Sequence, residues 1–335
     1  MSFACRPRFS CLRCQSRAFS SSYRLQAEQR PSPAAQAAAK TAATSPPPPG
    51  KSPTTPPPKT IPPSPLADVP RADGERVESF TPKPLLRPIG MPNPPRPGEN
   101  TGVDLRTLKQ RRDDFVNYEK HLEKREELKK KLLRPYFRDW GNLSFHKGKT
   151  FIAPPRPFKR ELSLFFPNLR GATPLAGDRG PRDTTPALRG RVSVVSVFSG
   201  AWAERQAGSF AAAESNPELE RALERGGGRA RRAWVNVEEN ALKRALVRLF
   251  AGAARRRVGE PDRDRYFLVA RGVTDDIRER LGLLNRSVGY VYLLDADCRI
   301  RWAGSGPSED HERRGLANAV LHLLEEEESL KKASG

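Results

Sequence analysis

The C-terminal part of the sequence predicts a single α/β domain, for which there are three observations. Short apolar runs have the length and composition of buried strands and are followed by helical patterns. These runs are 192–198, 233–237 and 266–270. A hairpin then follows, with strands at 289–294 and 299–303. A final helix runs from Ser308 to about Glu328. Strands that alternate with helices, followed by a hairpin and a last helix, are the thioredoxin-like layout.

The helices of this domain carry their own start and stop signals. Residues 202–224 follow the first strand and are expected to be largely helical, and 239–254 form the next helical pattern. Thr274 is suited to cap a short helix over 275–281, which has acidic residues first and arginines last. Gly282 then ends that helix.

The segment before the first core strand combines aromatic residues with prolines. Residues 151–168 have the sequence FIAPPRPFKRELSLFFPN. Burial of each Phe contributes roughly 1.5–3 kcal/mol, so exposure of these rings to water is unfavourable. We expect an extended arm or hairpin that covers an edge of the core, or an exposed contact surface.

The composition changes twice before this domain, which is expected over 140–330. Residues 31–100 hold most of the 33 prolines and predict a disordered, semi-extended linker. Residues 101–135 predict one long charged helix that Asp104 caps and Pro135 ends. Its narrow apolar stripe suits docking on a partner or on the domain, and the alternative is a solvated helix.

The first thirty residues have the composition of a mitochondrial import presequence. Residues 1–30 are rich in Arg and Ser and contain one acidic residue, Glu28. The RAFS sequence at 17–20 is similar to a processing site of matrix peptidases. The alternative is a disordered basic tail.

Composition also bounds the partners. The formal net charge of +21 favours an anionic partner such as RNA, an anionic lipid surface or an acidic protein. A basic organellar protein without a specific polyanion site has the same balance. Cys11 and Cys14 form a C-x-x-C with no second pair, so we expect no metal. No window has the length and apolarity of a transmembrane helix, so any membrane association is expected to be peripheral.

The turn after the first core strand lacks the residue that thiol enzymes place there. Ser199, Gly200, Ala201 and Trp202 occupy the junction of strand and helix, where a helix dipole stabilises a thiolate. The proline that faces the thiol in such enzymes is missing from 285–289 as well. We therefore expect no enzymatic activity, no cofactor and no small-molecule substrate. Trp202 is expected to fill space in a packing corner.

Cys298 is the one thiol outside the presequence. It lies in the hairpin turn next to Arg299 and near Arg301, which would lower its pKa. The two interpretations are a redox sensor and a tolerated turn cysteine, and we favour the second.

Residues 239–257 predict a basic amphipathic helix and give the candidate contact site. The helix either packs on the core with a solvated charged face or lies on an anionic membrane. In the second case each basic residue near the surface contributes about 1 kcal/mol. The residues expected to contact a membrane or partner are Lys243, Arg244, Arg248, Arg255, Arg256 and Arg257.

Four segments together resemble a known family over about 132–328. Their sequences are FIAPPRPFKRELSLFFPNL, DTTPALRGRVSVVSVFSGAWAE, NVEENALKRALVRLF and RERLGLLNRSVGYVYLLDADCRIRWAGSG. They are similar to the fungal mitochondrial ATP synthase assembly factors called ATPase complex subunit ten. The resemblance implies a thioredoxin/peroxiredoxin-like fold at the matrix face of the inner membrane. It also implies a role in installing subunit 6 (subunit a) in the membrane sector of the ATP synthase.

Three functions are therefore weighed. The favoured one is a non-catalytic assembly factor, or chaperone, that acts on subunit 6 as a peripheral protein of the inner membrane. The first alternative is a thiol oxidoreductase or peroxidase, against which the missing cysteine and proline argue. The second is a basic organellar RNA- or ribosome-binding protein. We expect no nucleic-acid partner, because the charge is spread over the chain and no aromatic RNA-binding signature is present.

Overall fold

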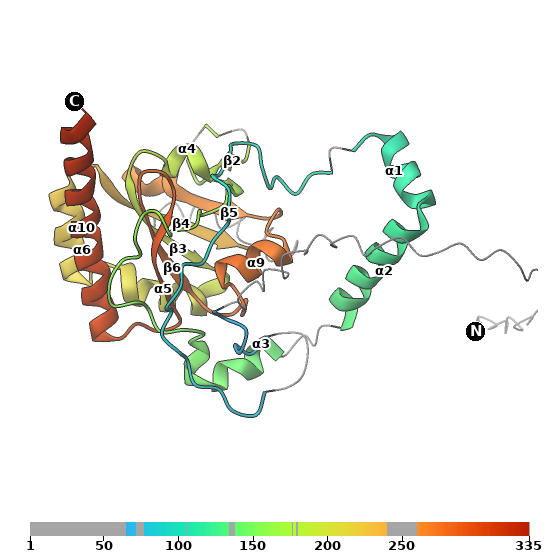
Figure 1. Cartoon of the computed structure of the whole chain (residues 1–335), viewed down its shortest axis with the longest axis horizontal. Helices are drawn as coiled ribbons and strands as arrows, with labels where there is room; N and C mark the ends of the chain where they lie inside the picture. Colours follow the sequence, from blue (N-terminus) through green and yellow to red (C-terminus); the bar gives the residue numbers. More distant parts are fainter. Residues whose placement is uncertain are drawn as a thin grey trace, which may run out of the picture. The chain divides into compact units, whose positions relative to one another are not determined.

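The structure is a computed structural model that describes residues 65–71, 77–104, 106–133, 138–175, 177–178, 180–239 and 260–334. In these residues one seven-stranded sheet has the order β2-β1-β5-β4-β3-β6-β7 (Figure 1). The strands are β1 (Arg170–Ala172), β2 (Arg182–Asp183), β3 (Val192–Phe198), β4 (Ala230–Val237), β5 (Tyr266–Val269), β6 (Tyr290–Leu294) and β7 (Ile300–Ser305).

The centre of the sheet has thioredoxin-like topology, as the sequence predicts. β3 and β4 are parallel, and β5 continues the parallel set beside β4. β6 is antiparallel to β3, and β7 is antiparallel to β6. β1 and β2 extend the sheet beyond β5 with antiparallel pairing.

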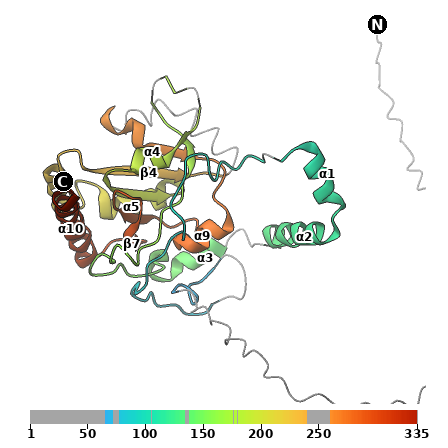
Figure 2. The same ribbon diagram turned by 45° about the horizontal axis from the view of Figure 1, so that its top comes forward.

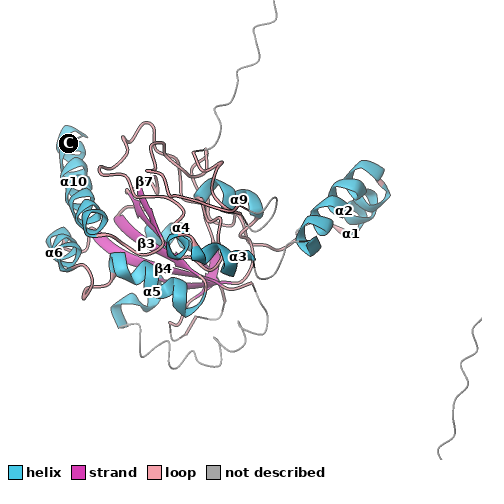
Figure 3. Cartoon of the chain, turned by 90° about the horizontal axis from the view of Figure 1, so that it is seen from below, coloured by secondary structure: helices cyan, strands magenta, loops and turns pink. Residues whose placement is uncertain are grey.

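The sheet separates two hydrophobic clusters, because successive strand residues point to opposite faces. Val192 and Val194 of β3 pack on one face with α5, α6 and α10. Val195 and Val197 pack on the other face, with α4 and α9 (Figures 2 and 3). These helices are α4 (Thr184–Leu188), α5 (Gly200–Ala211), α6 (Pro217–Gly226), α9 (Asp275–Leu281) and α10 (Asp310–Ser334).

The helix predicted over 202–224 is divided in two. α5 ends at Ala211, and Asn216 caps α6 by accepting a hydrogen bond from the Leu219 backbone N–H at 3.1 Å. Pro217 at the first position of α6 suits a helix start and removes a donor from any continuous helix. Asn216 followed by Pro217 was the signal for this boundary.

Part of the predicted linker is folded. Leu66, Val69, Leu85 and Ile89 are buried in the same cluster as α9. The described residues within 31–100 therefore differ from a disordered linker, and the rest of that range lies outside the described residues. Proline prevents regular ladders but does not stop single apolar side chains of an extended chain from packing.

The charged helix predicted over 101–135 is two helices, α1 (Leu108–Val116) and α2 (Tyr118–Leu133). The cap of α1 is Thr107, which forms a capping box with Gln110, rather than Asp104. No residue of α1 is buried. Large apolar side chains are therefore exposed on this pair of helices, namely Leu108, Phe115, Val116, Tyr118 and Leu122.

The aromatic and proline-rich segment forms an extended arm along the edge strand β7. The Phe158 N–H donates to the Arg301 carbonyl at 2.7 Å, and the Ile300 N–H donates to the Leu164 carbonyl at 2.7 Å. The arm thus satisfies backbone groups that an edge strand would otherwise expose. Of the two interpretations made from the sequence, the arm that covers an edge is confirmed.

Three short elements follow α2 in the sequence and precede the arm. They are α3 (Arg138–Gly141), η1 (Asn142–Ser144) and η2 (His146–Gly148). A fourth, η3 (Glu260–Arg265), leads directly into β5. The first three cover the site described next.

Candidate functional site

The corner between β3 and α5 is a strand–turn–helix junction without a thiol. Ser199 precedes α5 and makes no side-chain cap. Gly200 has φ of 79°, a conformation that favours glycine, and open space surrounds its Cα. Where a reactive cysteine would gain from the helix dipole, the chain presents only these small residues.

Trp202 lies on the surface of this corner. Trp202 is 44% exposed, and the Arg205 guanidinium lies 5.4 Å from the centroid of the indole ring. The prediction that Trp202 fills space in a packing corner is therefore wrong. Helical spacing explains the difference, because Ala203, Gln206 and Ala207 form the buried side of α5 and position 202 falls outside that side.

The loop that would carry the proline of a thiol enzyme packs directly on α5. A Cβ added to Gly289 would lie 2.1 Å from the Ala203 carbonyl oxygen. The Gly289 N–H donates to Gln206 Oε1 at 3.0 Å, and Gln206 Nε2 donates to the Lys147 carbonyl at 2.8 Å. A buried glutamine thus joins α5, the loop and η2 where a proline would face a thiol.

The segment from α3 to η2 covers the outer side of the same loop. Asn285 Nδ2 donates to the Asp139 carbonyl at 2.9 Å. A Cβ added to Gly148 would lie 2.6 Å from Val288 Cγ2. Residues of α3 and η2 therefore pack on the outer side of this loop, while Gly200, Ala201 and Trp202 at the corner are exposed. We call α3, η1, η2 and Lys149 the covering segment.

A buried ion pair holds the end of the covering segment. Lys149 Nζ lies 2.6 Å from Glu312 Oε2 of α10, and the two side chains are 4% and 0% exposed. Lys149 also donates to the Pro307 carbonyl, and Glu312 Oε1 accepts from the Ala153 N–H at 2.9 Å. The charges are thus paired and hydrogen-bonded, as burial requires.

Cys298 is not a reactive thiol. It is free and 1% exposed. Burial raises its pKa to about 12, and the nearby Arg189 offsets this only in part. The prediction that neighbouring arginines lower its pKa is therefore wrong. Arg299 instead lies over the Phe165 ring, and Arg301 pairs with Glu326.

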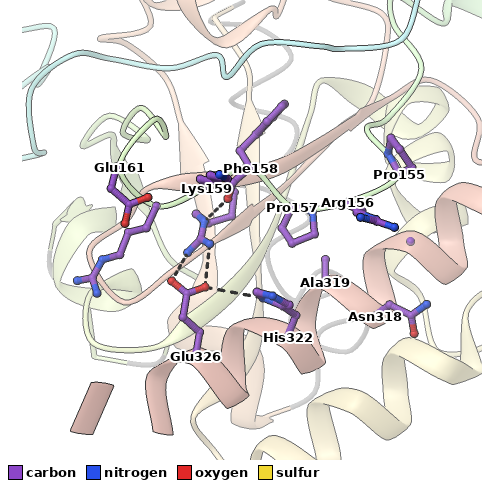
Figure 4. Close-up of a pocket in the computed structure, with 13 residues that line it drawn as sticks. Pro155, Arg156, Pro157, Phe158, Lys159, Glu161, Asn318, Ala319, His322 and Glu326 are labelled. Atoms are coloured by element: carbon purple, nitrogen blue, oxygen red, sulfur yellow. Dashed lines mark hydrogen bonds and ion pairs between the residues drawn. The ribbon is translucent and has the colours of Figure 1, made fainter. Parts of the chain in front are cut away.

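A groove of about 580 Å³ lies between the arm and α10 (Figure 4). At its base Arg301 donates to both oxygens of Glu326, at 3.1 and 2.8 Å, and to the Phe158 carbonyl at 2.7 Å. These hydrogen bonds hold the pKa of Glu326 below its usual range. His322 points toward Glu326, with its Nδ1 3.8 Å from Oε2. Among the residues that line the groove, no Ser, Thr or Cys nucleophile stands beside a base.

The contact residues expected from the sequence are not placed. Lys243, Arg244, Arg248, Arg255, Arg256 and Arg257 all lie outside the described residues. Within the described part of the chain, no group of three His, Cys, Asp or Glu residues is arranged to hold a metal ion. Over the same residues, no helix combines the length and apolarity needed to span a bilayer.

The topology and this corner define a class: a thioredoxin-like fold whose strand–turn–helix junction carries no thiol. A family model described as ATP10 protein matches residues 71–323, and the chain belongs to this family. The family resemblance found in the sequence is thereby confirmed.

Two relatives carry the name mitochondrial ATPase complex subunit ATP10. The protein of Eremothecium gossypii is 31% identical, over 72% of this chain and 85% of its own length. That of Saccharomyces cerevisiae is 31% identical, over 70% of this chain and 84% of its own length.

Solved structures with partial similarity are thiol–disulfide proteins. A secreted thiol-disulfide isomerase from Corynebacterium glutamicum has a TM-score of 0.35 at 10% identity, covering 53% of this chain and 99% of that chain. A thiol:disulfide interchange protein from Bacteroides sp. has a TM-score of 0.27 at 11% identity, covering 47% and 89%.

Proposed function

We propose that this protein is a non-catalytic assembly factor for the membrane sector of the mitochondrial ATP synthase. Membership of the ATP10 protein family and the names of the two relatives support the link to the ATP synthase. The non-catalytic part rests on one observation, the corner after β3. It has no thiol, and Gln206 and the covering segment occupy the neighbouring loop where a thiol enzyme would carry its proline.

The proposed partner is subunit 6, and the proposed location is the matrix side of the inner membrane, with peripheral association. The composition of 1–30 supports mitochondrial import. The net charge of +21 supports attraction to an anionic lipid surface. Subunit 6 is the partner that the family resemblance implies.

The surface of α1 and α2 is our candidate for contact with this client. Leu108, Phe115, Val116 and Tyr118 are exposed on two consecutive helices. A membrane subunit that awaits assembly presents apolar helices, which exposed apolar side chains can contact. Thr107 and its capping box fix the start of α1 without help from the core.

The test is deletion of the gene in its host, followed by native electrophoresis of the respiratory complexes. We expect loss of assembled ATP synthase, recovered by the full chain, while complexes without an ATP synthase subunit are unaffected. An intact ATP synthase with normal subunit 6 would refute the proposal.

The alternatives are tested on the purified chain. Insulin-reduction and peroxide-reduction assays should give no turnover above buffer, and cross-linking should recover no RNA. Thiol-dependent turnover would instead favour an oxidoreductase, and recovered RNA a nucleic-acid-binding protein.

A further inference from the structure

Three arginines lie at the N-terminal ends of three neighbouring parallel strands. Arg191 immediately precedes β3, Arg231 is the second residue of β4, and Arg265 immediately precedes β5. We call them the arginine triad. They are at the opposite end of β3 from the corner that lacks the thiol.

Strand register puts the three side chains on one face of the sheet. Arg231 pairs with Ser193, two residues after Arg191. On the other side Trp234 pairs with Tyr266, which sets Arg265 opposite Ala233, two residues after Arg231. Each flanking arginine is therefore a diagonal neighbour of Arg231, within reach of a long side chain.

Arg231 is a half-buried cation without an acidic partner. One of its terminal nitrogens donates to the Ala187 carbonyl of α4, and its Nε is buried with no hydrogen-bond partner. Within the described residues, no carboxylate lies within ion-pair distance of Arg231 or of the exposed Arg191. Arg265 differs, because Asp262 at 2.7 Å and Asp264 at 3.2 Å pair with it.

The neighbouring arginines of β4 show that this is a local exception. Arg232, which points to the other face, pairs with Glu220 of α6. Arg229, just before β4, pairs with Glu328 of α10 at 2.6 Å. Ion pairing is thus available to arginines at this end of the sheet, whereas Arg191 and Arg231 have no carboxylate partner among the described residues.

The electrostatics of Arg231 are unfavourable in the free protein. Burial, with the positive charges of Arg191 and Arg265, lowers the pKa of Arg231 to about 10, and Asp264 opposes this only in part. The guanidinium therefore stays protonated at neutral pH. A partly desolvated charge without a counter-charge is costly, so a bound anion would relieve the cost.

We propose that Arg191 and Arg231 bind a phosphate group at this end of the sheet. The planar guanidinium matches phosphate oxygens with two parallel hydrogen bonds, and two guanidinium groups match the charge of a phosphate better than one. The exposed Arg191 leaves the ligand accessible from solvent. The phosphate is that of a phospholipid headgroup or of a soluble phosphate compound, and the chemistry of recognition is the same.

The experiment measures binding of the full chain to two probes. The first is pyrophosphate in calorimetric titration. The second is flotation with vesicles of phosphatidylcholine, with and without phosphatidylglycerol. We expect the Arg191→Gln/Arg231→Gln variant to bind the effective probe at least ~10-fold more weakly, because it loses charge-assisted hydrogen bonds. The control Arg221→Gln/Arg314→Gln removes the same charge from two exposed positions and should bind as the unaltered chain does.

The two probes separate the sources of the phosphate. If pyrophosphate binds and the binding depends on Arg191 and Arg231, the phosphate is that of a soluble ligand. Binding to phosphatidylglycerol vesicles alone, again dependent on the triad, assigns a headgroup. Equal weakening in the test and control variants would show diffuse charge attraction and overturn the proposal, as would failure of both probes to bind.

Two further variants separate binding from folding. Arg191→Gln alone changes an exposed side chain and should weaken binding several-fold at an unchanged melting temperature. Where pyrophosphate is the probe that binds, it should raise the melting temperature of the unaltered chain and not that of Arg231→Gln. If the Arg191→Gln chain is folded and binds the effective probe as tightly as the unaltered chain does, the proposed phosphate site is contradicted.

Discussion

The two ends of β3 differ in the side chains that they present. At its C-terminal end, small residues stand where a thiol enzyme has its cysteine, and Gln206 and the covering segment pack on the neighbouring loop. At its N-terminal end, Arg191 and Arg231 remain charged and unpaired by carboxylates of the described residues. The first end thus presents a junction without a thiol, and the second presents positive charge.

The largest expected effect on the free energy of unfolding comes from breaking the buried ion pair that holds the covering segment. Lys149→Ala leaves the Glu312 carboxylate buried and without its ion-pair partner, which should cost about 3–5 kcal/mol of unfolding free energy. Arg71→Ala, which breaks the partly exposed pair with Glu279, should cost less than about 1 kcal/mol. Denaturant unfolding measures both. Equal costs for the two variants would mean that the buried pair does not hold the covering segment.

Gly289→Ala tests the close packing between its loop and α5. The added Cβ meets the Ala203 carbonyl oxygen, so the loop must move away from α5 at a cost of about 1–3 kcal/mol. The control is Gly208→Ala, inside α5 and with open space around it, which should stabilise by about 0.5–1 kcal/mol. Both values come from thermal or denaturant unfolding. Tolerance of Ala at 289 would show that loop and helix are not in direct contact.

Cys298 provides a pH-dependent test of its burial. Its folded pKa of about 12 exceeds the unfolded value of about 8.5, so its contribution is present below pH 8.5 and is lost as pH rises above it. At pH 10 the unaltered chain should have lost about 2 kcal/mol that Cys298→Ala does not lose. The measurement is unfolding free energy from pH 7 to 10 for both chains. Parallel curves would show that the thiol ionises as freely in the folded protein as in the unfolded one.

The smallest effect is expected at Trp202. Its exposed ring stacks on Arg205, so Trp202→Ala should change the unfolding free energy by less than about 1 kcal/mol. Trp302→Ala removes a fully buried ring and should cost about 3–5 kcal/mol. Comparable losses from the two substitutions would place Trp202 in the core.

The central sheet could be predicted from the sequence because its signals are local. Apolar runs gave the strands, and the caps at Thr274 and Gly282 gave α9 within its observed bounds. The missing thiol and proline were equally visible, since an absence at a defined position needs no structure. For segment 151–168 the phenylalanines predicted either an arm that covers an edge of the core or an exposed contact surface, and the structure shows the arm.

What could not be predicted depends on contacts between distant segments. Gln206 looks like an ordinary polar helix residue until Gly289 and Lys147 meet it in space. The burial of Leu66 and Ile89 was hidden by the prolines around them. For Cys298 the sequence showed the nearby arginines but not the desolvation, which has the larger effect on its pKa.

The central claim is that the protein acts in ATP synthase assembly without thiol chemistry. A chain that lacks all four cysteines tests it directly, with Cys5→Ser, Cys11→Ser, Cys14→Ser and Cys298→Ala expressed in the deletion host. We expect native electrophoresis to show ATP synthase at the level supported by the unaltered chain. A cysteine-free chain that is imported, folded and present at normal abundance, yet fails to restore the ATP synthase, would contradict the claim.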